Sequence, residues 1–197
     1  MKNLSERQPA TFEGVLIPCL YFEKQKNTVD RIEIVKEARE KYNSYNTIDW
    51  IQAGFDEFSG GYMVYHKDHF FDPTIGKFGI PRGDYERNAS KVLVKYGKRV
   101  VLCSEKQEYR EKTPDGLLNG ILFDIKGIEG IGKNNIINNL KSANKKGVES
   151  IVFYFHDKKL FSEKQLIESY QFYLRNSKSK RIQQVYYIVD KKLYLLK

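Results

Sequence analysis

Cysteine is scarce in this sequence, and long runs of apolar residues are missing. The two cysteines, Cys19 and Cys103, lie in apolar stretches, so we expect two buried free thiols rather than a disulfide. No Cys/His spacing typical of a zinc site is present. The longest apolar run, residues 15–22, contains Pro18 and is far too short to span a bilayer. These absences argue against a disulfide scaffold, a zinc domain and a membrane partner.

A secretion signal is also missing at the beginning of the sequence. Lys2 is followed by polar residues, whereas a signal peptide would continue with an apolar segment. Together with the free thiols, this pattern predicts a protein made in a reducing compartment. We therefore expect a cytoplasmic location in the cell that produces it.

Acidic residues are outnumbered, with 25 Asp and Glu against 34 Lys and Arg, which gives a net charge of +9. Such a charge favours a polyanionic partner, either nucleic acid, a membrane surface or an acidic protein. A lysine-rich composition inherited from an AT-rich genome would give part of the same bias without any function. The 14 Tyr and 12 Phe suit a strand-rich core, and base stacking is the alternative use.

Hydrophobic periodicity is weak before residue 84 and clear after it. The first part predicts strands over 11–22, a helix over 32–42, and short strands over 48–53 and 62–65. The second part predicts helices over 84–95, 134–146 and 162–174, and strands over 99–103, 117–126, 150–155, 182–189 and 193–196. We expect an α/β (α+β) fold in which helices flank a mixed central sheet. Residues 84–197 would form the main domain, and residues 1–83 an elaboration that binds substrate or packs on the core.

Two carboxylates and a lysine lie on two short adjoining strands of the predicted sheet. Asp115 precedes the first strand, and Asp124 and Lys126 are two residues apart on the second, so they share one of its faces. Two converging carboxylates form a hard oxygen site that suits Mg²⁺ or Mn²⁺. A lysine beside this site can hold a water or offset charge that develops on a phosphate. The motif predicts metal-dependent cleavage of phosphodiester bonds.

This motif resembles that of the PD-(D/E)XK nuclease superfamily. Pro114-Asp115 is followed, after eight residues, by Asp124-Ile125-Lys126. The superfamily core of a helix, three strands, a helix and a strand is similar to the order predicted over residues 84–155. Many members carry a further acid on the first helix, where this chain has Glu86. The resemblance implies a restriction-endonuclease-like core with Glu86, Asp115 and Asp124 as metal ligands and Lys126 as a further catalytic residue.

A closer resemblance covers about residues 84–197 and is to the C-terminal tRNase domains of contact-dependent growth inhibition (CdiA) toxins. It is carried by the helix with Glu86, by Gly97, by the Val-Val-Leu strand and Glu105, by Thr113-Pro114-Asp115-Gly116, and by the hairpin that leads to Asp124-Ile125-Lys126. It implies a toxin that cleaves tRNA in the cytoplasm of a competing cell, together with an immunity protein, which the +9 charge predicts to be acidic. The chain would be an excised effector domain or a free-standing protein of a phage or mobile element.

Some of these toxins carry a catalytic Gln on the helix after the lysine strand. The nearest positions here are Asn144, Lys145 and Lys146, and Lys145 is the candidate replacement. Lys133, Lys141 and Lys145 are also candidate contacts to nucleic acid, with solvated surface charge as the alternative.

Two other readings of the sequence stay open. The chain could be a DNA endonuclease of a mobile element or restriction system, or an inactive relative that binds nucleic acid or serves as a phage structural protein. His66, with His69 and Asp72, gives a weak metal-site pattern, and the favoured interpretations are a surface loop or a loop that contacts substrate.

Overall fold

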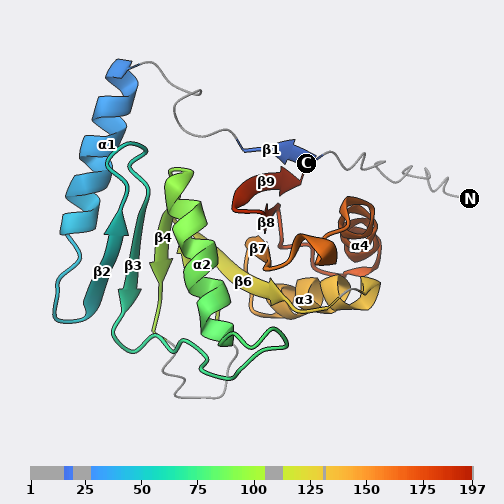
Figure 1. Ribbon diagram of the computed structural model, residues 1–197. Coiled ribbons are helices and arrows are strands. Elements are labelled where there is room, and N and C mark those ends of the chain that lie inside the picture. Colours follow the sequence, from blue (N-terminus) through green and yellow to red (C-terminus); the bar gives the residue numbers. More distant parts are fainter. Residues whose placement is uncertain (1–15, 20–27, 105–112, 131, 197) are drawn as a thin grey trace, which may run out of the picture.

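A computed structural model of the chain describes residues 16–19, 28–104, 113–130 and 132–196. These residues form a nine-stranded mixed sheet with helices packed on both faces (Figure 1). The strand order is β1-β9-β8-β7-β6-β5-β4-β3-β2. The strands are β1 (Leu16–Pro18), β2 (Trp50–Phe55), β3 (Tyr62–His66), β4 (Arg99–Leu102), β5 (Gly116–Leu118), β6 (Ile121–Ile128), β7 (Ser150–Phe155), β8 (Gln184–Val189) and β9 (Lys192–Leu196).

The helices separate groups of one to three strands along the chain. They are α1 (Thr28–Asn43), α2 (Arg82–Lys95), α3 (Lys133–Lys145) and α4 (Glu163–Asn176), with the short 3-10 helix η2 (Lys158–Leu160) before α4. The order predicted from residue 84 onward is confirmed, as is the fold class of a mixed sheet flanked by helices. Among the described residues, no helix is long and apolar enough to cross a membrane.

Local sequence signals account for most of the element boundaries. Asn119 and Gly120 both have positive φ, 52° and 84°, as the tight turn between β5 and β6 requires. The Ser162 side chain caps α4 by accepting a hydrogen bond from the backbone N–H of Gln165. Gly97, with φ of 72°, follows α2 in the left-handed region and ends that helix.

Several details differ from the sequence predictions, including the bounds of α1, β2 and β8. We predicted that the strand ends at Lys126, but β6 continues to Ile128. The parallel ladder with β7 explains the extension, because it runs on to the pair Ile128–Phe155. Cys19 and Cys103 are free thiols as predicted, but both are half-buried rather than fully buried.

Residues on either side of position 84 contribute to the same sheet. β3 pairs with β4 in parallel over four residue pairs, and the hairpin partner β2 forms one edge of the sheet. At the other edge, β1 pairs antiparallel with β9. The strands of residues 1–83 that the structure describes therefore complete the sheet at both edges.

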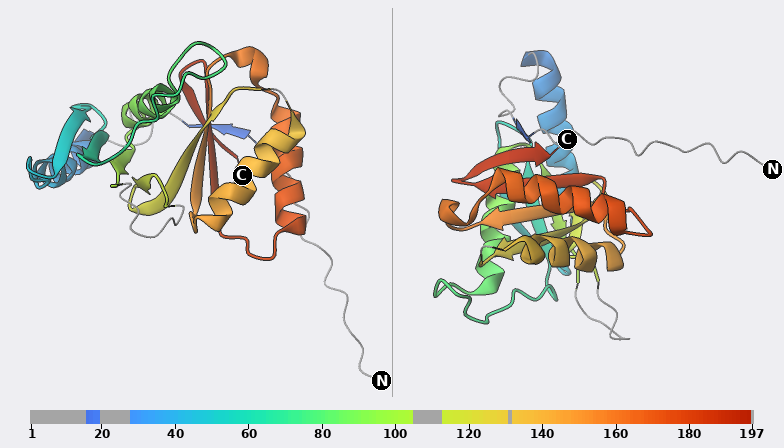
Figure 2. Two further views of the ribbon diagram at one scale, coloured as in Figure 1. Left: turned by 90° about the horizontal axis from the view of Figure 1, so that it is seen from below. Right: turned by 90° about the vertical axis from the view of Figure 1, so that its right-hand side faces the viewer.

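The two faces of the sheet carry different helices. α2 packs on one face against a cluster that includes Leu102, Phe123 and Ile125. α3 and α4 pack on the opposite face, against a cluster that includes Ile151 and Phe153 (Figure 2). Because side chains alternate along a strand, Asp124 and Lys126 point to the face of α3, while Phe123 and Ile125 point to α2.

Candidate active site

The hairpin of β5 and β6 brings the predicted motif together. The Asp115 backbone N–H donates to the Phe123 carbonyl (3.1 Å), and the Asp115 carbonyl accepts from the Cys103 N–H (2.9 Å). These bonds extend the ladder by one residue beyond β5 and fix Asp115 beside β6. Asp124 then lies on β6 with a fully buried side chain. The local pairing of the hairpin thus places both carboxylates on one face of the sheet.

A single ammonium group lies between the two carboxylates. Lys146 Nζ is 2.6 Å from Asp124 Oδ1 and 3.2 Å from Asp115 Oδ1. The other oxygen of Asp115 accepts from the Ile125 backbone N–H at 2.6 Å. Lys126 Nζ is 2.5 Å from Asp124 Oδ2, although no hydrogen bond of good angle reaches this buried oxygen. Lys146 therefore contacts both carboxylates, and Lys126 contacts Asp124 alone.

Burial and charge drive the pKa values of the two aspartates apart. Burial, reinforced by the negative charge of Asp124, raises the pKa of Asp115 well above its usual range. Burial would also raise the pKa of Asp124, but the hydrogen bond from Asp115 and the charges of Lys126 and Lys146 outweigh it and lower this pKa. Burial alone would lower the pKa of Lys146, yet the two carboxylates raise it. Asp124 is therefore the carboxylate that stays ionised, and Lys146 stays charged.

Glu86 reaches this site from α2 on the other face of the sheet. Its Oε1 is 3.0 Å from Nε2 of His69, whose side chain is fully buried. His69 Nδ1 lies 2.8 Å from the carbonyl oxygen of Cys103, the residue whose N–H pairs with Asp115. His69 thus connects the glutamate of α2 to the end of β4 beside the aspartates.

A close approach of α2 to β6 makes this convergence possible. A Cβ added to Gly127 would lie 2.4 Å from the Tyr85 ring, so only glycine allows Tyr85 to pack here. Tyr85 precedes Glu86 in α2, and the contact brings the start of α2 to the edge of β6. Glu86, Asp115 and Lys126 consequently line one cleft of about 610 Å³, with Asn135 and Asn139 of α3 on its other side.

The donor set of this cleft suits a hard divalent cation. No three His, Cys, Asp or Glu side chains within the described ranges are gathered closely enough to hold a metal by themselves. Mg²⁺ does not need them, because it commonly binds one or two carboxylates and completes its shell with water and phosphate oxygens. The Lys146 ammonium already shows that Asp115 and Asp124 can share one cation. Asp115 and Asp124 therefore fit a Mg²⁺ site, and Glu86 lines the same cleft.

Residues 112–192 match the family model of the contact-dependent growth inhibition CdiA C-terminal domain. The predicted resemblance to CdiA is thereby confirmed for this segment. It contains Asp115, Asp124, Lys126 and Lys146, so the CdiA-like part of the chain holds both carboxylates and both lysines of the site. Comparison with curated proteins and with solved structures gave no match. The match covers less than half of the chain, and the chemistry has to be inferred from the site itself.

The other predicted residues lie outside the carboxylate pair of this CdiA-like segment. Lys141 and Lys145 are exposed on α3, and the Lys141 ammonium lies 5.8 Å from the centre of the Phe172 ring. His66, on β3, packs edge-on against Trp50, with ring centres 5.2 Å apart. Lys133 begins α3, and the structure describes its backbone but not its side chain.

Sequence reasoning missed the lysine that contacts both aspartates. Lys145 was the candidate replacement for a catalytic Gln, but its neighbour Lys146 reaches the carboxylates. Helical spacing could have predicted the position of Lys146. Asn135 and Asn139 line the cleft, and Lys146 is seven residues after Asn139, hence on the same side of α3. Lys145 is rotated away from that side by about 100°.

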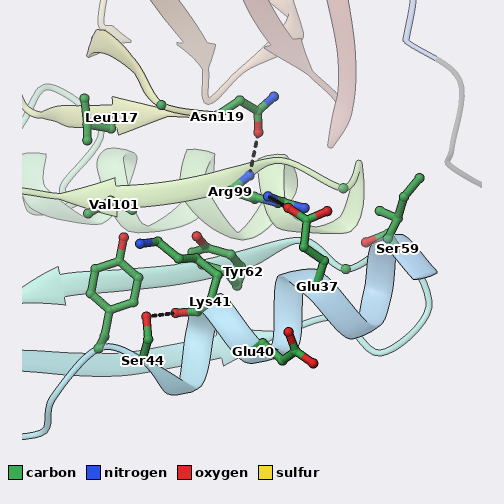
Figure 3. A pocket seen from close by; sticks show the side chains of 15 residues that line it. Glu37, Glu40, Lys41, Ser44, Ser59, Tyr62, Arg99, Val101, Leu117 and Asn119 are labelled. Atoms are coloured by element: carbon green, nitrogen blue, oxygen red, sulfur yellow. Dashed lines mark hydrogen bonds and ion pairs between the residues drawn. The ribbon is translucent and has the colours of Figure 1, made fainter. Parts of the chain in front are cut away.

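A second cleft, of about 820 Å³, lies away from the carboxylate pair (Figure 3). It is formed by α1 and by the ends of β3, β4 and β5 that are farthest from Asp115. Its charged side chains are of both signs, and Arg99 Nη1 is 3.3 Å from Glu37 Oε1. The Asn119 side chain accepts from the Arg99 backbone N–H at 2.8 Å (Figure 3). The cleft lacks the paired carboxylates of the smaller one, so we assign the chemistry to the smaller one.

Proposed function

We propose that the chain is a Mg²⁺-dependent endonuclease of the PD-(D/E)XK type that acts as a contact-dependent growth inhibition toxin, with tRNA as its substrate. The observation that carries this proposal is the pair of aspartates, Asp115 and Asp124, that shares one cation beside Lys126. A buried carboxylate pair with lysines suits a site that must bind both a cation and a phosphate.

Each side chain of the site would have a distinct role in this reaction. Asp115 and Asp124 would hold the metal, with Glu86 as a further acid in the cleft. The bound Mg²⁺ would supply Lewis-acid activation of the scissile phosphate and of the attacking water. Lys126, on the wall of the cleft, would orient that water or offset the charge developing on the phosphate. Lys146 would hold the carboxylates together in the absence of metal.

The preference for tRNA rests on the resemblance to CdiA tRNase domains, which the match over residues 112–192 supports. A toxin of this kind needs an immunity protein in the cell that makes it. The +9 charge of the chain favours an acidic partner, because complementary charge speeds and directs association. Protection of cells by an acidic protein encoded next to the toxin would support this partner.

Cleavage assays on two substrates test the proposal. The full chain would be incubated with total bacterial tRNA and with plasmid DNA, each with Mg²⁺ or EDTA. We expect cleavage of tRNA with Mg²⁺ alone, and its loss in Asp124→Asn and Lys126→Gln. Asp190→Asn is the matched control, since Asp190 is exposed in the turn between β8 and β9. Cleavage of plasmid but not tRNA would make the chain a DNA endonuclease, and full activity of Asp124→Asn would refute the site.

A further inference from the structure

A groove of about 470 Å³ lies on the face of the sheet that carries α2, between this helix and the β2–β3 hairpin. Its floor is apolar and aromatic, with Met63 and Tyr65 from β3 and Phe71 from the segment before α2. Phe71 packs edge-on against Tyr65, with ring centres 5.3 Å apart. None of these residues belongs to the carboxylate site, and we call this feature the α2 groove.

Positive charge lines the helical side of the α2 groove. Arg87, Lys91 and Lys95 are exposed and spaced four residues apart, so they form a row of cations about 6 Å apart along α2. Within the described ranges, no carboxylate lies within ion-pair distance of Lys91 or Lys95. Arg87 contacts Asp84 at 3.0 Å and stacks over Phe71, with its guanidinium carbon 3.9 Å from the ring centre. A row of cations beside an aromatic floor suits a chain of phosphates with attached bases.

The single acid that lines the α2 groove is committed to a turn. Asp56 Oδ1 accepts from the backbone N–H groups of Ser59 (2.7 Å) and Phe58 (3.2 Å). This carboxylate therefore stabilises the end of the hairpin and only partly offsets the cations across the groove. The balance of charge remains positive, which favours an anionic occupant over a neutral or cationic one.

The α2 groove begins where the active-site cleft ends. Glu86 lines the cleft and its neighbour Arg87 lines the groove, so adjacent residues of α2 face the two cavities. His69, which holds Glu86, also packs edge-on against Phe71 of the groove, with ring centres 4.7 Å apart. A strand that leaves the cleft past Glu86 would meet Arg87 first, then Lys91 and Lys95.

We propose that the α2 groove binds a single-stranded segment of the nucleic acid substrate that flanks the scissile phosphate. Successive phosphates contact Arg87, Lys91 and Lys95, and a base packs on the aromatic floor. This inference rests on the proposed nuclease function and adds a substrate site to it. It also gives the β2–β3 hairpin a role in substrate binding.

Binding without cleavage provides the test. The Asp124→Asn background would be combined with Arg87→Gln, Lys91→Gln and Lys95→Gln, and binding of a fluorescein-labelled single-stranded RNA would be followed by anisotropy across a series of salt concentrations. The control carries Lys164→Gln, Lys178→Gln and Lys180→Gln, which remove the same charge from exposed positions in and after α4, on the opposite face of the sheet. Circular dichroism and thermal melting would verify that both variants are folded.

We expect the α2 variant to bind at least about tenfold more weakly at physiological salt, with a log–log salt slope reduced by about 2, the value for three single-strand phosphate contacts. The α4 control should keep the background affinity and slope. An abasic strand of the same length should bind the background protein about tenfold more weakly, since it cannot stack on the floor.

Two failures can be told apart in this experiment. The α2 variant and the α4 control could bind with equal affinity while the unmodified chain still cleaves tRNA. This result would leave the proposed function standing and refute the substrate site in the α2 groove. Loss of affinity in both variants to the same extent would also overturn it, because charge anywhere on the surface would then suffice. If the unmodified chain neither binds nor cleaves nucleic acid, the proposed function fails and the groove fails with it.

Discussion

His69 Nε2 lies 3.0 Å from Glu86 Oε1, and this contact joins the segment before α2 to the helix that delivers an acid to the cleft. The other ring nitrogen of His69 is held by the Cys103 carbonyl at 2.8 Å. Both nitrogens face oxygen acceptors, and the side chain is fully buried. The histidine therefore fixes the orientation of Glu86 relative to the strand end beside Asp115.

Removing this histidine should weaken both the fold and the cleavage reaction. We expect His69→Ala to lower the free energy of unfolding by about 2 kcal/mol, because the partly buried Glu86 carboxylate loses its ring-nitrogen partner. Urea denaturation and tRNA cleavage would be measured on the same preparation. His66→Ala is the control, since His66 packs on Trp50 instead. Equal effects of the two substitutions would contradict a specific role of His69 in positioning Glu86.

Lys146 should compete with metal for the two aspartates. Without metal, we expect Lys146→Met to be less stable by about 3 kcal/mol, because Asp115 and Asp124 lose the cation they share. Addition of Mg²⁺ should then raise the melting temperature of the variant more than that of the unmodified chain, since no ammonium has to be displaced. Lys145→Met removes the same charge from an exposed position and should behave like the unmodified chain. A similar response of both variants to Mg²⁺ would exclude this competition.

The glycine that admits Tyr85 should tolerate no side chain. Gly127→Ala would place a Cβ 2.4 Å from the Tyr85 ring, and the displacement of α2 should cost about 1–3 kcal/mol of stability. Cleavage should fall as well, because Glu86 moves with the helix. Gly130→Ala is the control, since nothing lies within 4 Å of a Cβ at that position. Urea denaturation would report the stability of both variants, and an unchanged Gly127→Ala protein would contradict the close packing.

Buried tyrosines should make the protein sensitive to alkali. Burial, reinforced by the negative charge of Tyr45, raises the pKa of Tyr62 from 10.0 to about 12. The fold favours the neutral phenol, so its contribution to stability is complete below pH 10 and is lost as the pH rises toward 12. Stability should therefore fall over this range in urea denaturation at successive pH values, and less steeply in Tyr62→Phe. Ultraviolet titration of the folded protein should show one late-titrating tyrosine fewer in that variant.

The sequence by itself determined the elements and the core of the site. The order of helices and strands after residue 84 was predictable because it depends on signals that act over a few residues. These signals are the hydrophobic periodicity, the Asn119-Gly120 turn and the Ser162 cap. Asp115, Asp124 and Lys126 were predictable for the same reason, because a hairpin and a two-residue spacing place them on one face.

Only the tertiary structure decided which distant residues complete the site. Lys146 and His69 reach the aspartates and Glu86 through the packing of α3 and of the segment before α2, and no local pattern specifies that packing. The same holds for β3, which pairs with β4 and contributes to the floor of the α2 groove, and for β2, which pairs with β3 at the edge of the sheet. Contacts across long stretches of chain depend on how buried surfaces fit together, and that fit is a property of the whole fold.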